Sequence, residues 1–277
     1  MPVKKDPSGR RSVQAEVEVP GTPEAVWQAI ATGPGISAWF VPAEVDGRLG
    51  GKTVCHFGPG NSMDSVATIT EWQPPHRFVA ETTEGPGAVA TEWVVEAKAG
   101  GTCTVRVVHG WFADGDDWDS QFEGHAYGWA SFFKILRFYL QHFPGQQSVL
   151  VQVAAQHNGA VPEAFERLMG PLGIAQSADG QAVDTGGDVP ELGGTVLEAQ
   201  NSLHGFSVIL RLDRPAPAIA HMIGFPMGGP VYVSVRFYLY GAEAASVAGE
   251  VENAWQTWLG TRFPSASAAE AAAGHCS

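Results

Sequence analysis

The sequence predicts an α+β protein built from two similar domains, each with an antiparallel sheet closed by a C-terminal helix. Three observations support this fold class. The phrase PEAVWQAIATGPGI at residues 23–36 returns in altered form as PEAFERLMGPLGI at residues 162–174. Short alternating strands fill residues 44–109, and each half ends on an aromatic-rich helical segment followed by Phe-Pro. With 277 residues, the chain also exceeds the usual size of a single core.

The repeat extends beyond this phrase, in the same order in both halves. A strand-like run precedes it each time, as SVQAEVEV and SVLVQVAA, and a Leu-Gly-Gly segment follows it. The copies lie a domain length apart, which indicates a duplicated domain and not a short solenoid repeat. The boundary is expected in HFPGQQS (142–148), where Pro and Gly end a helix. The expected organisation is a disordered tail at 1–11, a first domain at 12–145, a second at 146–264 and a disordered tail at 265–277.

In the first half, a strand is followed by a helix and then by several strands. Thr22 is a good N-cap and Pro23 suits the first helical position, so a helix is expected there that stops near Gly33-Pro34. Later runs alternate in character, as ATEWVVEA (90–97) does. Such alternation is typical of consecutive antiparallel hairpins with one wetter face.

The last element of the first half carries the strongest helical period. SQFE (120–123) is a capping box, and from it apolar residues recur at steps of four and three, at Phe122, Ala126, Trp129, Phe133, Leu136, Leu140 and Phe143. This spacing predicts a helix of about six turns. The acidic segment 113–124 lacks EF-hand spacing, so its carboxylates are expected to complement the helix dipole and not to bind calcium.

The second half repeats the plan with fewer recognisable strands. Residues 204–212 and 229–241 alternate and are expected to be strands. Residues 251–263 are expected to form a closing helix that is shorter than its counterpart in the first half.

Composition and charge exclude several classes of protein. Hydrophobic residues make up 44% and charged residues 16%, so the chain has ample core material. The net charge is −13, and acidic residues outnumber basic ones in both halves, which argues against nucleic-acid binding. Cys55, Cys103 and Cys276 form no CxxC pair, so we expect no disulfide framework, metal ion or cofactor. There is no apolar run of signal-peptide or membrane-spanning length, so we expect no membrane span and a cytoplasmic location.

Five segments within residues 13–143 resemble a known family. They are VWQAIATGPGISAWF, LGGK, SVATITEWQPPHRF, GTCTVRVVHGWF and GWASFFKILRFYL. In order and spacing they resemble the activator-of-heat-shock-protein-ATPase homologue branch of the START-related (SRPBCC) superfamily. The resemblance implies a helix-grip fold, in which a curved antiparallel sheet wraps a long C-terminal helix and leaves a ligand cavity between them. The second half resembles a degenerate copy, because its early strands are shortened and the Pro-Pro turn is missing.

A curved sheet that one helix does not fill leaves a hollow in which an apolar molecule gains by leaving water. From strand alternation and the helix stripe, the expected wall residues are Trp39, His56, Trp93, Cys103, Val105, His109, Trp129 and Phe133. A register slip of one residue would exchange His56 for Cys55 and Phe57. Each wall residue also has a purely structural interpretation, and for the two histidines a hydrogen-bonded structural role is favoured over a base or a metal ligand.

Three functions are compatible with these features. The first, which we favour, is binding of a small hydrophobic molecule such as a lipid, a polyketide or an aromatic metabolite. The second is a cyclase or dehydratase acting on such a molecule, with His56, His109 or Glu92 as acid or base; no nucleophile motif, phosphate loop or metal cluster supports it. The third, implied by the family name, is a chaperone or protein-interaction module. The sequence is compatible with a protein partner or with a homodimer.

Overall fold

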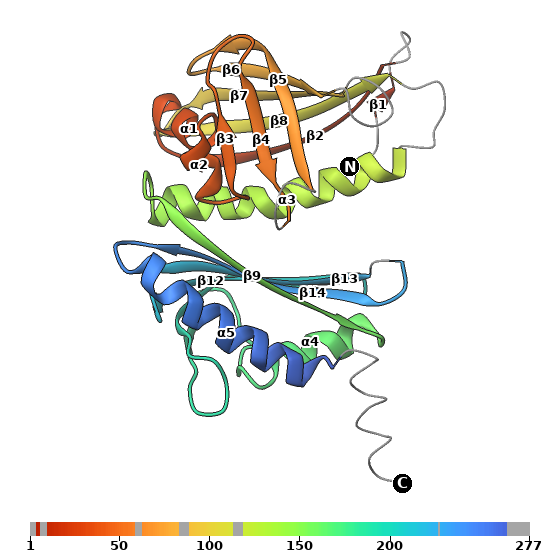
Figure 1. Cartoon of the computed structure of the whole chain (residues 1–277), viewed down its shortest axis with the longest axis vertical. Helices are drawn as coiled ribbons and strands as arrows, with labels where there is room; N and C mark the ends of the chain where they lie inside the picture. The colour runs from red at the N-terminus through yellow and green to blue at the C-terminus, as the bar shows by residue number, and fades with distance from the viewer. Residues whose placement is uncertain are drawn as a thin grey trace. The chain divides into compact units, whose positions relative to one another are not determined.

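The computed structural model describes residues 4–5, 10–58, 63–82, 89–112, 119–226 and 228–264. The chain divides into two compact units, Met1–Gln147 and Ser148–Ser277 (Figure 1). Each unit holds one antiparallel sheet and ends its folded part with a long helix, so the predicted fold class, a duplicated helix-grip, is confirmed.

The sheet of the first unit follows the order β1-β2-β8-β7-β6-β5-β4-β3. Its strands are β1 (Lys4–Lys5), β2 (Arg10–Pro20), β3 (Ala43–Val45), β4 (Lys52–His56), β5 (Asp64–Gln73), β6 (Arg77–Thr82), β7 (Val89–Lys98) and β8 (Thr102–Phe112). The helices are α1 (Pro23–Ile30), α2 (Gly33–Ser37) and α3 (Asp119–His142). Helix α3 packs along β2 and closes the open side of the curved sheet (Figure 1).

The start of this unit differs from the expected tail at residues 1–11. Lys4 and Lys5 pair with Ser12 and Arg11 in an antiparallel ladder, and β2 begins at Arg10. Residues 4–5 and 10–11 of the expected tail are therefore β structure. The strand β2 pairs with β8 up to Arg10, which lies opposite Phe112, and β1 pairs with the first residues of β2.

Two short helices replace the single helix expected after β2. Thr22 Oγ1 accepts a hydrogen bond from Ala25 N at 3.3 Å and caps α1, as its sequence position predicts. Helix α1 ends at Ile30, and Gly33-Pro34, where the expected helix was to stop, opens the second helix. Thr32 Oγ1 accepts from Gly35 N at 3.0 Å, so α2 starts there with proline in its first turn, a position that needs no backbone N–H.

Helix α3 has 24 residues and begins at Asp119. Phe133, Leu136, Leu140 and Phe143 of its predicted apolar stripe are all buried. The side chains of the expected capping box and the acidic residues at 113–118 lie outside the described residues.

The second unit has the sheet order β10-β11-β12-β13-β14-β9. Its strands are β9 (Ser148–His157), β10 (Ala182–Asp184), β11 (Gly193–Ser202), β12 (Gly205–Arg214), β13 (Ala218–Pro226) and β14 (Val231–Tyr240). Its helices are α4 (Val161–Met169) and α5 (Ala244–Arg262). The closing helix thus begins earlier than the expected residue 251, because Ala244 and Val251 are both buried in the core of the unit.

The core of the second unit is filled by large side chains. Trp255 of α5 is 1% exposed, and its ring lies 5.3 Å from that of Phe237 and 5.4 Å from that of Trp258. Phe165 of α4 packs edge-on against Phe206 at 5.4 Å. Neither unit's described residues include a helix long and apolar enough to cross a bilayer.

Candidate functional site

The first unit contains a pocket of ≈ 570 Å³ between the inner face of its sheet and helix α3, which we call the first-unit pocket. It is lined by Ile36, Trp39, Phe40, Thr53, Cys55, Phe57, Ser65, Ala67, Phe78, Ala80, Thr91, Trp93, His109, Gly128, Trp129 and Phe132. Alternate residues of the strands face it, as the period of two requires. Small residues on opposite walls, Ala67 and Ala80 on the sheet and Gly128 on α3, leave the volume open.

The apolar wall is a set of mutually packed aromatic rings. Trp93 meets Trp129 edge-on at 5.1 Å and stacks on Phe78 at 6.1 Å. Phe40 lies 4.9 Å from Trp129 and 4.5 Å from Phe132. Edge-to-face and offset pairs of this kind are favourable beyond their buried area, so the wall is held in shape without a ligand.

Trp39 is anchored at the end of the pocket next to α2. Its indole N–H donates to the Ala29 carbonyl at 2.9 Å, and the side chain is fully buried. Because its polar atom bonds back into α1, Trp39 presents only ring carbon to the pocket.

A polar group interrupts the aromatic wall at His109. Its Nδ1 lies 3.0 Å from Thr91 Oγ1, and the indole N–H of Trp129 donates to its Nε2. An indole nitrogen is only a donor, so Nε2 must accept and carries no proton. The bonding pattern therefore assigns a neutral imidazole with its proton on Nδ1, which donates to Thr91 Oγ1.

Cys55 places a thiol on the β4 wall of the pocket. Burial disfavours the thiolate and raises the pKa of Cys55 to about 11. The group is therefore a protonated, weakly reactive thiol near neutral pH.

The structure brings together part of the expected wall. Trp39, Trp93, His109 and Trp129 line the first-unit pocket. The other four expected wall residues are not among the lining residues, namely Cys103, Val105, Phe133 and His56.

Three of these four lie in the core behind the pocket wall. Cys103 and Val105 are fully buried on the inner face of β8, and Cys103 Sγ lies 3.4 Å from the Gly21 carbonyl, near the start of α1. Phe133 is buried behind Trp93 and Trp129, at ring distances of 6.0 and 5.7 Å.

His56 is on the opposite face of the sheet, which corrects the expected register of β4. Thr53 and Cys55 face the pocket, with Phe57 just beyond the strand, and His56 Nδ1 lies 2.8 Å from Asp64 Oδ1. The one-residue alternative is therefore the register that the chain adopts. In this register His56 lies opposite Asp64 across β4 and β5.

Several lining residues were missed by the sequence reasoning. Thr91 shares the strand face of Trp93, and Phe132 begins a second apolar line on α3 that continues through Ile135 and Tyr139, so a sequence signal existed for both. Ala67, Ala80 and Gly128 give no sequence signal, because a small residue at such a position is equally compatible with close packing.

Glu92, the other candidate acid or base, is also outside the pocket. It forms an ionic cluster with Arg77 and Glu71, in which Arg77 Nε donates to Glu92 and Arg77 Nη1 donates to Glu71. The hydrogen bonds that Arg77 donates, to Glu71 first and then to Glu92, raise its pKa. Among the described residues, no group of three or more His, Cys, Asp or Glu side chains is placed to hold a metal ion.

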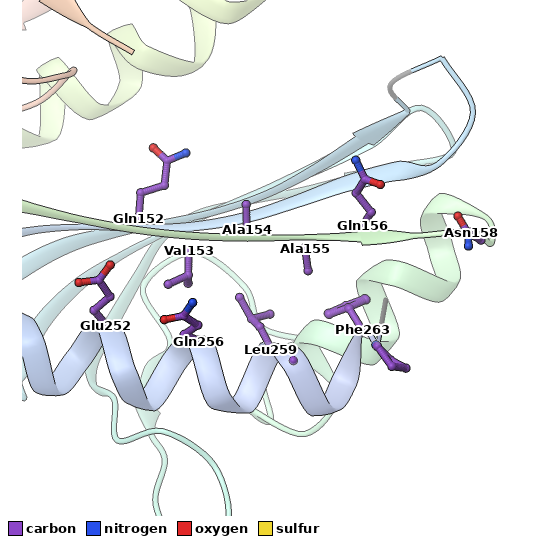
Figure 2. Close-up of a pocket in the computed structure, with 12 residues that line it drawn as sticks. Gln152, Val153, Ala154, Ala155, Gln156, Asn158, Glu252, Gln256, Leu259 and Phe263 are labelled. Atoms are coloured by element: carbon purple, nitrogen blue, oxygen red, sulfur yellow. The ribbon is translucent and has the colours of Figure 1, made fainter. Parts of the chain in front are cut away.

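The second unit has a groove of ≈ 540 Å³ along β9 and α5, which we call the β9 groove. In Figure 2, Val153 and Ala155 point toward α5, whereas Gln152 and Gln156 point away from it. The strand β9 stands at the end of the sheet order, so this groove follows a sheet edge, and its floor includes the core residues Val153, Leu259 and Phe263.

A curved antiparallel sheet closed by a long helix over an internal pocket defines a START-related helix-grip domain. Residues 20–141, which lie in the first domain, match the model of the family described as activator of Hsp90 ATPase homolog 1-like protein. No curated protein matches the chain.

Several solved structures are similar to the chain at low sequence identity. CalU16 from Micromonospora echinospora is 18% identical, with 52% of this chain and 83% of that chain covered and a TM-score of 0.41. DynU16, from the dynemicin biosynthetic locus, is 18% identical over 89% of this chain and 94% of its own, with a TM-score of 0.40. BexL, the di-domain ARO/CYC of the BE-7585A biosynthetic pathway, is 13% identical over 91% and 94%, with a TM-score of 0.43.

Proposed function

We propose that the first domain binds one small, mostly apolar molecule in the first-unit pocket. The observation that carries this proposal is the pocket itself, ≈ 570 Å³ lined by seven aromatic side chains of Trp and Phe. Its volume falls in the range of about 300–1,000 Å³ that is typical of small-molecule sites. Flat ring walls favour an aromatic guest, since offset and edge-on ring contacts add to the burial of apolar area.

Burial alone gives such a guest modest affinity. A molecule that buries about 250 Å² of apolar surface gains about 6 kcal/mol at 25 cal/mol per Å². Association costs at least about 4 kcal/mol in lost translational and rotational freedom. Tight binding in this pocket therefore depends on a directed polar contact as well.

A cyclase or dehydratase is the second candidate, and the observation that favours it is His109 at the pocket wall. Of the lining residues that the structure describes, His109 and Cys55 are the ones with titratable side chains. For His109 to act as a base, its Nε2 has to give up the hydrogen bond from Trp129, or its Nδ1 proton has to pass through Thr91. Cys55, with its raised pKa, is a poor nucleophile.

Native mass spectrometry of the full chain tests the binding proposal. Purified protein, or protein incubated with a set of bicyclic aromatic compounds, should carry one small molecule per chain. The control variants are Gly128→Leu, which puts a side chain into the pocket from α3, and Gly128→Ala, which adds a single methyl group. Uptake should be lost in the first variant and kept in the second.

Two outcomes would contradict the proposal. Equal uptake by Gly128→Leu and the unmodified chain would place any bound molecule elsewhere. No uptake by the unmodified chain, together with capture of a chaperone, would favour the protein-interaction role instead.

A further inference from the structure

The pocket wall contains a chain of three hydrogen-bonding side chains whose direction is fixed at one end. Trp129 donates to His109 Nε2, and His109 Nδ1, 3.0 Å from Thr91 Oγ1, therefore donates to the threonine oxygen. The indole cannot reverse its role. The direction from Trp129 through His109 to Thr91 follows from that alone.

The last member of this chain has a hydrogen atom left to donate. A hydroxyl carries one O–H donor and two acceptor lone pairs, and one lone pair of Thr91 Oγ1 is occupied by the imidazole N–H. In the part of the chain that the structure describes, Thr91 Oγ1 makes no further hydrogen bond. The residue lines the pocket, so an acceptor on a bound molecule can take this hydrogen.

We infer that Thr91 is the specificity-determining donor of the first-unit pocket, and that the pocket prefers an apolar molecule carrying a neutral acceptor oxygen, such as an aromatic ketone or aldehyde. This inference rests on the binding function proposed above. A hydrocarbon of the same shape leaves the Thr91 hydroxyl without a partner, which costs affinity. Polarisation along the chain strengthens the hydroxyl as a donor.

Charge on the lining residues separates a neutral acceptor from a carboxylate. Among the described residues, those that line the first-unit pocket include no Lys or Arg. A carboxylate moved into the aromatic wall loses its hydration without gaining a countercharge. The net charge of −13 opposes its approach as well.

The other hydroxyls of the pocket do not impose this preference. Thr53 and Ser65 line the wall formed by β4 and β5, and within the described part of the chain no neighbouring donor sets the direction of either hydroxyl. Each can rotate to donate or to accept. Thr91 alone among these three is held as a donor.

Three naphthalene probes of similar size test the inference by tryptophan fluorescence titration of the full chain. They are 2-acetylnaphthalene with a neutral acceptor, 2-ethylnaphthalene without one, and 2-naphthoate with a charged one. The ketone should bind roughly five- to tenfold more tightly than the hydrocarbon, as expected for one hydrogen bond to a fixed donor. The carboxylate should bind most weakly.

Variants of Thr91 assign the preference to its hydroxyl. Thr91→Val should bring the ratio of ketone to hydrocarbon affinity close to one, and Thr91→Ser should keep most of it. Thr68→Val makes the same change at an exposed position of β5 and should leave the ratio unchanged. If Thr91→Val does not fold, Thr91→Ala provides the same comparison with a smaller side chain.

The possible failures are distinguishable. A ratio near one in the unmodified chain, or a ratio that Thr91→Val leaves intact, overturns the role of Thr91 while binding itself stands. Absence of binding by all three probes, or binding that Gly128→Leu does not reduce, overturns the proposed function.

Discussion

His56 and Asp64 form a hydrogen-bonded pair on the outer face of β4 and β5, with His56 Nδ1 2.8 Å from Asp64 Oδ1. Glu44 Oε1 lies 4.0 Å from the other imidazole nitrogen. His109, in contrast, is on the inner face at the pocket wall. The two histidines that the sequence placed together in the pocket wall thus lie on opposite faces of one sheet.

Substitution of these two histidines should therefore separate stability from binding. His56→Ala is expected to lower the free energy of unfolding by about 0.5–1.5 kcal/mol, as one hydrogen bond is lost, and to leave ligand affinity unchanged. His109→Ala is expected to weaken binding of the ketone probe severalfold, because Thr91 is no longer held as a donor. Urea unfolding and fluorescence titration measure the two effects. A loss of ligand affinity in His56→Ala would contradict the placement of His56 outside the pocket.

The sequence predicted best those elements in which apolar residues recur with a single clear periodicity. In α3, apolar residues at steps of three and four leave one possible buried stripe, and Phe133, Leu136 and Leu140 occupy it. The strand alternation of β7 likewise puts Trp93 inside and Glu92 outside, paired with Arg77.

The register of β4 was not predictable in the same way. Val54 and Cys55 are adjacent and both apolar, so either face of the strand could have pointed inward. The face that points inward is settled by how β4 pairs with β5, where His56 lies opposite Asp64, and the pattern of β4 alone does not contain this pairing. The open volume of the pocket depends in the same way on three small residues from different elements, Ala67, Ala80 and Gly128.

The tautomer of His109 can be measured directly. A long-range ¹H–¹⁵N NMR spectrum should show Nδ1 protonated and Nε2 unprotonated, because Trp129 can only donate to Nε2. Loss of the corresponding signals in His109→Gln assigns them. In Trp129→Phe the constraint is removed, and the population should shift toward the form protonated on Nε2. A proton on Nε2 in the unmodified chain would contradict the assigned direction of the hydrogen-bond chain.

Cys55 should react slowly with iodoacetamide in the folded protein. With its pKa raised to about 11 by burial, about a hundredfold less thiolate is present near pH 8 than in an unperturbed cysteine. Peptide mapping of the alkylated protein from pH 7 to 11 should show a rate that still rises above pH 9, and a bound ligand should lower it. A rate that levels off below pH 9 would contradict the buried, protonated thiol.

The same raised pKa predicts a dependence of stability on pH. Because the pKa of the Cys55 thiol is higher in the folded state than its ordinary value of 9.0, the folded state retains the proton more strongly. The resulting stabilisation is fully present below pH 9 and is lost as the pH rises from 9 to about 11. Cys55→Ala should remove this part of the pH dependence, and urea midpoints measured across that interval provide the comparison.

Gly128 offers a change in which stability and binding move in opposite directions. It lies inside α3, and a Cβ built on it meets no atom within 4 Å. Replacing glycine by alanine in a helix interior stabilises the helix by about 0.8–1 kcal/mol, and leucine gains nearly as much. Gly128→Leu should therefore raise the thermal midpoint while it abolishes binding of the naphthalene probes, because its side chain occupies the volume that a guest requires. A Gly128→Leu variant that is less stable than the unmodified chain, or that binds the probes equally well, would show that the space beside Gly128 is not the space in which the ligand is held.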